Sequence, residues 1–214
     1  MRHAEVSYVD DAGAPVNPEQ VPLTARGREQ AESARRALAG IDLDLVVASG
    51  LPRTIETAAL VAPGHEVERW PELSEWRGGR LDAIPPEELE QAFIGALRVT
   101  NEGDRFLGGE SLGEALDRVH PAFERLLARD WETALVVLHG GVNRIVLSYA
   151  LTSDRTYFGA FEQAPACINV LDLGVDGWIV RIVNYVSYDP LHPARETTME
   201  HLWAQLQAYL GQRP

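Results

Sequence analysis

The sequence predicts an α/β fold: a doubly wound, mostly parallel sheet flanked by helices, with a helical insertion and a C-terminal hairpin. Apolar runs of strand length alternate with helical patterns through the first and middle thirds of the chain. Residues 83–129 contain helical patterns alone, and two alternating segments meet at Asp176-Gly177, a dipeptide typical of hairpin turns. Because ligands of such folds bind beyond the carboxyl ends of the strands, residues that directly follow a strand are the first candidates for function.

Composition narrows the range of partners. The chain has 214 residues, of which 45% are hydrophobic, enough for a sizeable core and for a single domain over residues 1–214. A net charge of −13 without any run of Lys or Arg argues against nucleic acid and against an anionic membrane surface. The single cysteine, Cys167, excludes an internal disulfide and a cysteine-based metal cage.

The sequence also predicts where the protein resides. The N-terminus lacks the apolar stretch of a signal peptide, so we expect a cytoplasmic protein. The longest apolar stretch, residues 133–151, is interrupted by His139, Asn143 and Arg144, which argues against a membrane span. The oligomeric state is left open.

The first third of the chain predicts two helices and two strands. Thr24 is placed to cap a helix over residues 25–39, and Gly40 is placed to end it in the left-handed conformation. Residues 43–49 form a continuous apolar run, which predicts a strand buried on both faces. A helix over residues 53–62 and a short strand over residues 67–69 are expected to follow.

The rest of the chain begins with the insertion at residues 83–129. Within it, one helix is expected to follow Pro85 and Pro86, and Ser111 with Glu114 forms a capping box that opens a second helix. After the insertion the patterns predict a strand over 133–138, a helix ending near Leu151, strands over 167–173 and 178–184, and a helix over 197–210.

Two polar residues follow predicted strands and suit an anion. Arg53 lies in the first turn of a helix, where a cation opposes the helix macrodipole by ~0.3–1 kcal/mol, so a bound anion or a salt bridge to Glu56 would explain it. His139 precedes Gly140 and Gly141 at a helix N-terminus, which is a ready anion site; the alternative is a hydrogen-bonded core histidine.

Taken singly, His3 beside Arg2 could be part of a solvated terminus, and Glu75 could be a surface acid. In combination they belong to a series of motifs that occur in the order Arg2-His3-Ala4-Glu5, Leu23-Thr24-x-x-Gly27-x-x-x-Ala31, Ser49-x-Leu51-x-Arg53-Thr54-x-x-Thr57-Ala58, Leu73-x-Glu75 and His139-Gly140-Gly141-x-x-Arg144. The series resembles the histidine phosphatase superfamily, in the branch of cofactor-dependent phosphoglycerate mutases and their phosphatase relatives. The resemblance spans about residues 2–151, and Gly109-Glu110-Ser111 matches a weaker family feature.

The resemblance implies phosphoryl transfer that needs neither a metal nor another cofactor. His3 would attack phosphorus as a neutral imidazole and form a phosphohistidine. Glu75 would protonate the leaving alkoxide and then activate water. Forked Arg donors match phosphate oxygens, so the resemblance implies a phosphate shell made of Arg2, Arg53, His139 and the N–H of Gly140.

Departures from the family pattern bear on the substrate. Tyr8-Val9 stands where mutases carry a Trp-Asn pair, which removes a side-chain amide that Asn17 could replace. The region after Glu75 lacks the longer basic segment with which mutases hold a sugar-acid phosphate. Candidate substrate contacts, against the alternative of solvated surface residues, are Arg77, Arg80 and Arg105.

Three functions fit these residues. The favoured one is a metal-independent phosphomonoesterase that acts through a phosphohistidine on a small phosphorylated substrate. A phosphoglycerate mutase-type phosphotransferase is second, because the departures argue against it. A catalytically inactive phosphate-binding or scaffold module is third, since all the pocket residues and the acid are present.

The start of the chain carries one further expectation. In the family the Arg-His pair stands at the carboxyl end of an inner strand, yet only Met1 precedes Arg2 here. A strand usually takes about 5–6 residues. We therefore expect the natural start to lie upstream, neighbouring strands to lack a partner, and His3 to be anchored from one side only.

Overall fold

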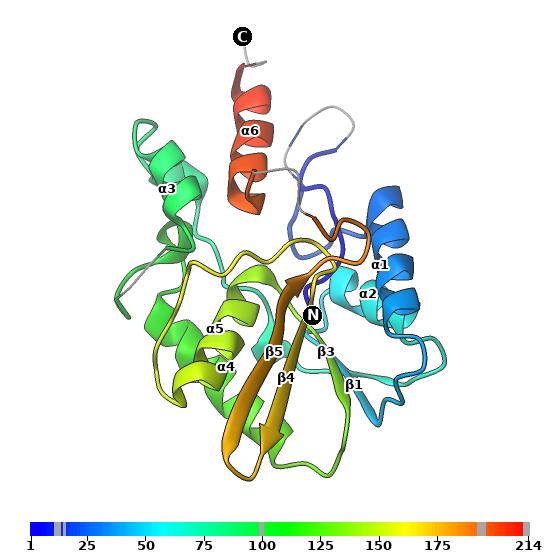
Figure 1. Ribbon diagram of the computed structural model, residues 1–214. Coiled ribbons are helices and arrows are strands. Elements are labelled where there is room, and N and C mark those ends of the chain that lie inside the picture. The colour runs from blue at the N-terminus through cyan, green and yellow to red at the C-terminus, as the bar shows by residue number, and fades with distance from the viewer. Residues whose placement is uncertain (11–13, 15, 99–100, 192–195, 212–214) are drawn as a thin grey trace.

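Three parallel strands form the central sheet of the computed structural model, which describes residues 1–10, 14, 16–98, 101–191 and 196–211 (Figure 1). The strand order is β2-β1-β3, with β1 (Leu45–Ala48) between β2 (Val67–Arg69) and β3 (Ala134–Val137). The predicted parallel strands are confirmed, and β1 and β3 are shorter at both ends than the apolar runs that predict them.

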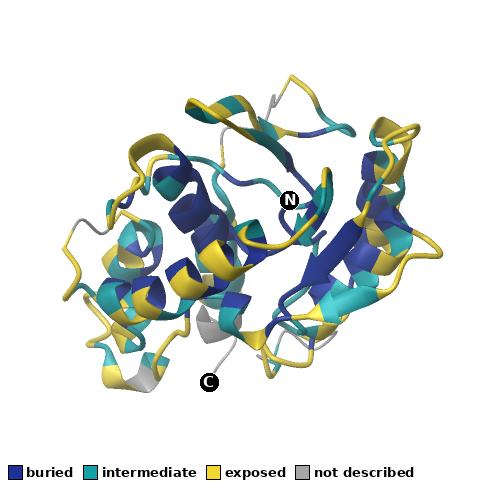
Figure 2. Cartoon of the chain, turned by 90° about the horizontal axis from the view of Figure 1, so that it is seen from below, coloured by how far each residue is buried: buried dark blue, intermediate teal, exposed yellow. Residues whose placement is uncertain are grey.

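Helices cover both faces of this sheet, as the predicted fold requires (Figure 1). On one face lie α1 (Ala25–Ala37) and α2 (Pro52–Val61). On the other lie α4 (Leu112–Leu127) and α5 (Gly140–Thr152). Buried residues, dark blue in Figure 2, gather where the helices meet the sheet.

The central strand β1 shows why a continuous apolar run was needed. Leu45 and Val47 pack in the cluster of α4 and α5, whereas Val46 and Ala48 pack in the cluster of α1 and α2. Successive side chains of a strand point to opposite faces, so a strand covered on both sides must be apolar at every position. The prediction of a strand buried on both faces is confirmed.

The capping signals of the sequence act as expected. The Thr24 side chain accepts a hydrogen bond from the Gly27 N–H at 2.9 Å and opens α1. Gly40 has the positive φ of +86° that favours glycine, although α1 ends two residues earlier than predicted, at Ala37. A methyl group on Gly27 would lie 2.2 Å from the Glu5 carbonyl, so the glycine lets α1 approach the first segment of the chain.

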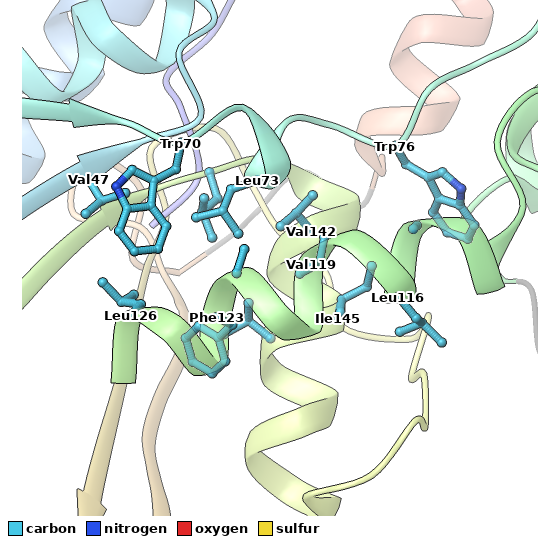
Figure 3. Packing of buried hydrophobic residues seen from close by; sticks show 14 of the residues in the cluster. Val47, Trp70, Leu73, Trp76, Leu116, Val119, Phe123, Leu126, Val142 and Ile145 are labelled. Carbon is cyan, nitrogen blue, oxygen red and sulfur yellow. The ribbon is translucent and has the colours of Figure 1, made fainter. Parts of the chain in front are cut away.

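The predicted insertion, residues 83–129, contains α3 (Leu89–Gly95) and α4, and the Ser111–Glu114 capping box of α4 is present. The apolar face of α4 is part of the main core. Figure 3 shows its Val119 and Phe123 among the residues that pack with Ile145 of α5. The predicted insertion therefore packs against the core through α4.

The C-terminal part of the chain forms the predicted hairpin and a last helix. β4 (Ile168–Gly174) pairs antiparallel with β5 (Gly177–Tyr185), and Gly177 has φ +108°. The turn residues are thus one position earlier than the predicted Asp-Gly pair. Helix α6 (Thr198–Gly211) packs on α3, and the Phe93 and Trp203 ring centroids lie 5.7 Å apart. None of the helices within the described ranges is both long and apolar enough to cross a membrane.

The first three residues lie beside β3 and continue the sheet. Arg2 bridges Leu138 in parallel register, the His3 N–H donates to the Leu138 carbonyl at 2.9 Å, and the Leu138 N–H donates to the Met1 carbonyl at 2.8 Å. On the opposite side, the Ala166 N–H donates to the His3 carbonyl at 3.1 Å. The expectation that His3 is anchored from one side only is therefore wrong. The expected upstream strand stays a prediction.

Candidate active site

Adjacent extended segments end at the same edge of the sheet and bring the predicted site together. His139 directly follows Leu138 at the end of β3, and Arg53 follows β1 in the first turn of α2. His3 lies beside β3, and its ring centroid is 5.1 Å from that of His139 with an interplanar angle of 64°. All three side chains are buried. Segments far apart in the sequence therefore form one polar cluster.

The surroundings of His3 fix which of its nitrogens carries the proton. Nδ1 lies 2.7 Å from the Ala4 carbonyl oxygen, which can only accept, so Nδ1 carries the hydrogen and Nε2 keeps its lone pair. Burial, followed by the positive charges of Arg53 and Arg2, holds the pKa of His3 well below its usual value. The Ala4 carbonyl opposes this shift without reversing it. His3 is thus a neutral imidazole with a free Nε2 at pH 7.

A chain of hydroxyl groups orients His139. Its Nε2 lies 2.7 Å from Ser49 Oγ, which lies 3.1 Å from Thr54 Oγ1, and Thr54 Oγ1 donates to the Leu51 carbonyl at 2.8 Å. Because Thr54 gives its only hydroxyl proton to Leu51, Ser49 donates to Thr54 and accepts from His139 Nε2. Burial, then Arg53 and His3, holds the pKa of His139 well below its usual value, so its Nδ1 is unprotonated.

Arg2 and Arg53 each have a buried N–H group without a hydrogen-bond partner in the described part of the chain. Among the described residues, the buried side-chain nitrogens without a hydrogen-bond partner are Arg2 Nε, Arg53 Nε, His139 Nδ1 and His120 Nε2. Three of these four belong to the cluster of His3. Leaving a buried donor unpaired costs about 1–3 kcal/mol, so such groups mark a place built for another ligand.

The alternative explanation of Arg53, a salt bridge to Glu56, is wrong. Its Nη1 donates to the Pro18 carbonyl at 2.6 Å, while Glu56 pairs with Arg28 at 2.7 Å. Arg53 therefore has no carboxylate partner among the described ion pairs, and its charge faces the histidines.

Arg2 is hydrogen-bonded to a buried network of side-chain amides, which the sequence analysis missed. Arg2 Nη1 donates to the Gln163 carbonyl at 2.5 Å and to the Thr198 hydroxyl of α6 at 2.8 Å. Gln163 is fully buried, and its Oε1 accepts from Asn143 at 2.9 Å and from Asn169 at 2.8 Å. These residues come from separate parts of the chain, so no local spacing or motif could have indicated them.

Glu75 lies in the loop after β2 and contacts the first turn of α5. Its Oε1 accepts from the N–H of its neighbour Trp76 at 3.0 Å and from the Gly141 N–H of α5 at 3.2 Å. A methyl group on Gly141 would lie 2.9 Å from Oε1, so a larger residue here would make the carboxylate shift. A methyl group on Gly140 would lie 3.7 Å from Arg2 Nε. Glu75 thus contacts the turn of α5 that also approaches Arg2.

The candidate substrate contacts have different surroundings. Asn17 is exposed, and its Oδ1 accepts from the Glu19 N–H at 2.9 Å, although its neighbour Pro18 contacts Arg53. Arg77 and Arg80 are exposed in the loop that carries Glu75. Arg105 donates to the Gly109 carbonyl at 2.6 Å and pairs with Glu114 at 3.3 Å.

Comparison with known proteins agrees with this geometry. Residues 1–186 match the family model of the histidine phosphatase superfamily, branch 1. The match covers most of the chain, so the protein belongs to this superfamily, and phosphatase is its enzyme class.

The individual relatives carry the names of different enzymes. The chain is 28% identical over 171 residues to the adenosylcobalamin/alpha-ribazole phosphatase of Escherichia coli, covering 76% of this chain and 83% of the relative. It is 32% identical over 178 residues to the probable phosphoglycerate mutase GpmB of Salmonella paratyphi A, covering 78% and 83%. The crystal structure of a putative alpha-ribazole-5'-P phosphatase from Escherichia coli superposes with a TM-score of 0.68 at 26% identity, covering 86% of this chain and 93% of that one.

Proposed function

We propose that the protein hydrolyses phosphomonoesters of small molecules through a phosphohistidine at His3, without a metal ion. The observation that carries this proposal is the arrangement around His3. Its Nε2 has a free lone pair, and the positive charges of Arg2 and Arg53, each with an unpaired Nε–H group, act on its ring. A nucleophile next to unpaired cationic donors suits a tetrahedral anion such as a phosphoryl group.

In the first half-reaction, His3 Nε2 attacks phosphorus and the bond from phosphorus to the ester oxygen breaks. Glu75 donates a proton to the departing alkoxide. Arg2 and Arg53 neutralise the phosphoryl oxygens. The phosphoryl dianion raises the proton affinity of the nearby His139, whose unpaired Nδ1 then takes up a proton from solvent and donates a hydrogen bond. That proton returns to solvent when the phosphate leaves.

In the second half-reaction, water attacks the phosphohistidine. Glu75, now ionised, takes a proton from the water, the bond between phosphorus and His3 Nε2 breaks, and inorganic phosphate leaves. His3 returns to its neutral state, which its buried surroundings favour. The cycle is balanced: one ester and one water give one alcohol and one phosphate.

Hydrolysis is favoured over mutase activity by two features of this chain. Tyr8-Val9 replaces the amide-bearing pair of mutases, and only Arg77 and Arg80 follow Glu75 in place of a longer basic segment. A mutase must hold its phosphorylated product until the group returns, whereas a phosphatase needs only access for water. Arg77 and Arg80 remain the candidates for an anionic group of the substrate beyond the phosphate.

Turnover of p-nitrophenyl phosphate in the presence of EDTA tests this proposal. We expect release of nitrophenol with EDTA present, and hydrolysis of 3-phosphoglycerate without formation of 2-phosphoglycerate. Interconversion of the two phosphoglycerates would identify a mutase. Binding of phosphate without any turnover would identify a scaffold module, and loss of turnover on adding EDTA would show that a metal takes part.

A further inference from the structure

The Gly109-Glu110-Ser111 motif has a neighbour in α4 that the proposed chemistry does not use. Arg118 is partly buried, with 13% of its side chain exposed, and it uses all five of its N–H groups. Nε and Nη2 bind the two carboxylate oxygens of Glu110 at 2.7 and 2.8 Å. The other three bonds go to the carbonyls of Glu72 at 2.8 Å, Ser74 at 2.7 Å and Glu75 at 3.1 Å.

Glu110 holds the other side of the same loop. Its Oε2 accepts from the Arg77 N–H at 3.0 Å, and its own N–H donates to the Arg77 carbonyl at 2.8 Å. Its carbonyl accepts from Trp76 Nε1 at 2.9 Å. Together, Arg118 and Glu110 bond to the chain both immediately before and immediately after Glu75.

This pair replaces secondary structure that the loop lacks. Residues 74–80 contain neither helix nor strand, so no backbone ladder fixes Glu75. Burial opposes the ionisation of Glu110, but its hydrogen bonds with Arg118 and Arg77 outweigh burial and keep its pKa below the usual value. The bidentate pair therefore stays ionised at neutral pH, and an ionised pair of this geometry is rigid.

We propose that Arg118 and Glu110 are positioning residues that hold Glu75 at the distance at which it exchanges protons with the ester oxygen. This inference rests on the proposed role of Glu75. Displacement of a reacting group by about 1 Å costs about 10²-fold in rate. The Arg118–Glu110 pair, called the clamp below, therefore matters for catalysis beyond its effect on folding.

The test substitutes the clamp while keeping charge or size. Arg118→Lys keeps the positive charge but has three donors for five acceptors, and Glu110→Gln keeps the size but loses the charge. Arg125→Lys is the matched control. Arg125 lies on the same helix and binds only the Glu72 side chain, at 3.0 Å, and the face of Trp70, at 4.3 Å.

The measured quantity is kcat/KM, determined separately for an alkyl phosphate and for p-nitrophenyl phosphate. For each substrate, kcat/KM reports the steps from binding up to departure of the leaving group. A poor leaving group needs the proton from Glu75, whereas nitrophenolate needs little help. We expect Arg118→Lys to lose about 10²-fold with the alkyl ester and less than about 5-fold with the nitrophenyl ester. Glu110→Gln should show the same asymmetry to a smaller degree, and Arg125→Lys should change neither ratio by more than about 2-fold.

Glu75→Gln, measured in parallel, separates failure of this inference from failure of the proposed function. Equal losses of Arg118→Lys on both substrates, or no loss, while Glu75→Gln shows the asymmetry, would mean that the clamp is merely structural and would overturn the inference. Absence of the asymmetry in Glu75→Gln itself would overturn the acid role of Glu75 and the inference with it. Should Arg118→Lys fail to fold, Glu110→Gln decides by the same criterion.

Discussion

The two halves of the site are held in place by different means. On the histidine side, His3 and His139 continue extended segments, and backbone hydrogen bonds of the sheet fix them. On the acid side, Glu75 lies in an irregular loop that the side chains of Arg118 and Glu110 hold. The histidine side thus shares the stability of the core, whereas the loop of the acid side depends mainly on one ion pair. Substitutions should therefore remove chemistry on the first side and displace it on the second.

The largest effect is expected on the histidine side. His3→Ala removes the proposed nucleophile, so kcat should fall by at least about 10⁴-fold with every substrate. The backbone bonds of His3 do not involve its ring, so circular dichroism and the melting temperature should stay close to those of the parent. A variant that keeps full activity would place the nucleophile elsewhere.

On the acid side, Glu75→Gln should lower kcat for an alkyl phosphate by ~10² to 10⁴, the scale for loss of a general acid. The loss in kcat/KM should shrink for p-nitrophenyl phosphate, because its leaving group needs little protonation. The amide keeps the size of the carboxylate, so the hydrogen bond from Gly141 remains possible. Equal losses on both esters would remove Glu75 from this role and erase the contrast between the two halves.

Arg53 tests whether donor geometry matters on the histidine side. Arg53→Lys keeps the charge but loses the fork, and a charge-assisted hydrogen bond is worth about 1.5–3 kcal/mol, so kcat/KM should fall by about 10- to 10²-fold. Inhibition by vanadate should weaken similarly. Arg28→Lys, an exposed arginine whose ion pair links α1 to α2, is the control and should change kcat/KM by less than about 2-fold. Equal effects of the two substitutions would contradict a phosphate contact of Arg53.

The sequence predicted the histidine side better than the acid side. His139 and Arg53 directly follow buried apolar runs, and parallel strands end at one edge of a sheet, so their meeting could be predicted from local patterns. The Gln163 carbonyl accepts from Arg2, and Arg118 donates to the Ser74 carbonyl, each across a long stretch of sequence. Such contacts depend on tertiary packing and leave no spacing in the sequence.

The resemblance to a known family supplied the roles of His3 and Glu75, which their neighbours alone did not indicate. Residue type alone indicated Arg105 as a substrate contact, and in the structure its guanidinium pairs with Glu114 in the first turn of α4.

The smallest expected effect is on the pH dependence of the free energy of unfolding. Burial, then Arg53, lowers the pKa of His3 and of His139, whereas the unfolded chain titrates near the usual value of about 6.5. Below about pH 6.5 the unfolded state therefore binds more protons, and the free energy of unfolding falls as pH decreases, by up to about 1.4 kcal/mol per pH unit for each histidine. Above that pH neither state is protonated and the contribution is constant.

Denaturant unfolding between about pH 7 and pH 5 measures this slope above the usual pKa range of carboxylates. His139→Gln should show a shallower decline than the parent protein, because one group that titrates only in the unfolded state is gone. Parallel curves for the parent and the variant would mean that His139 is protonated in the folded state. The histidine side would then already carry its charge before a phosphoryl group binds.

Trapping of the phosphorylated enzyme tests the central claim most directly. The protein is mixed with a radiolabelled phosphomonoester, denatured within the first turnover at alkaline pH, and divided between acid and base before the bound label is counted. We predict a label that acid removes and base leaves, that maps to the peptide of Arg2 and His3, and that is absent from His3→Ala. A label that survives acid, or that maps to a serine or an aspartate, would contradict the account.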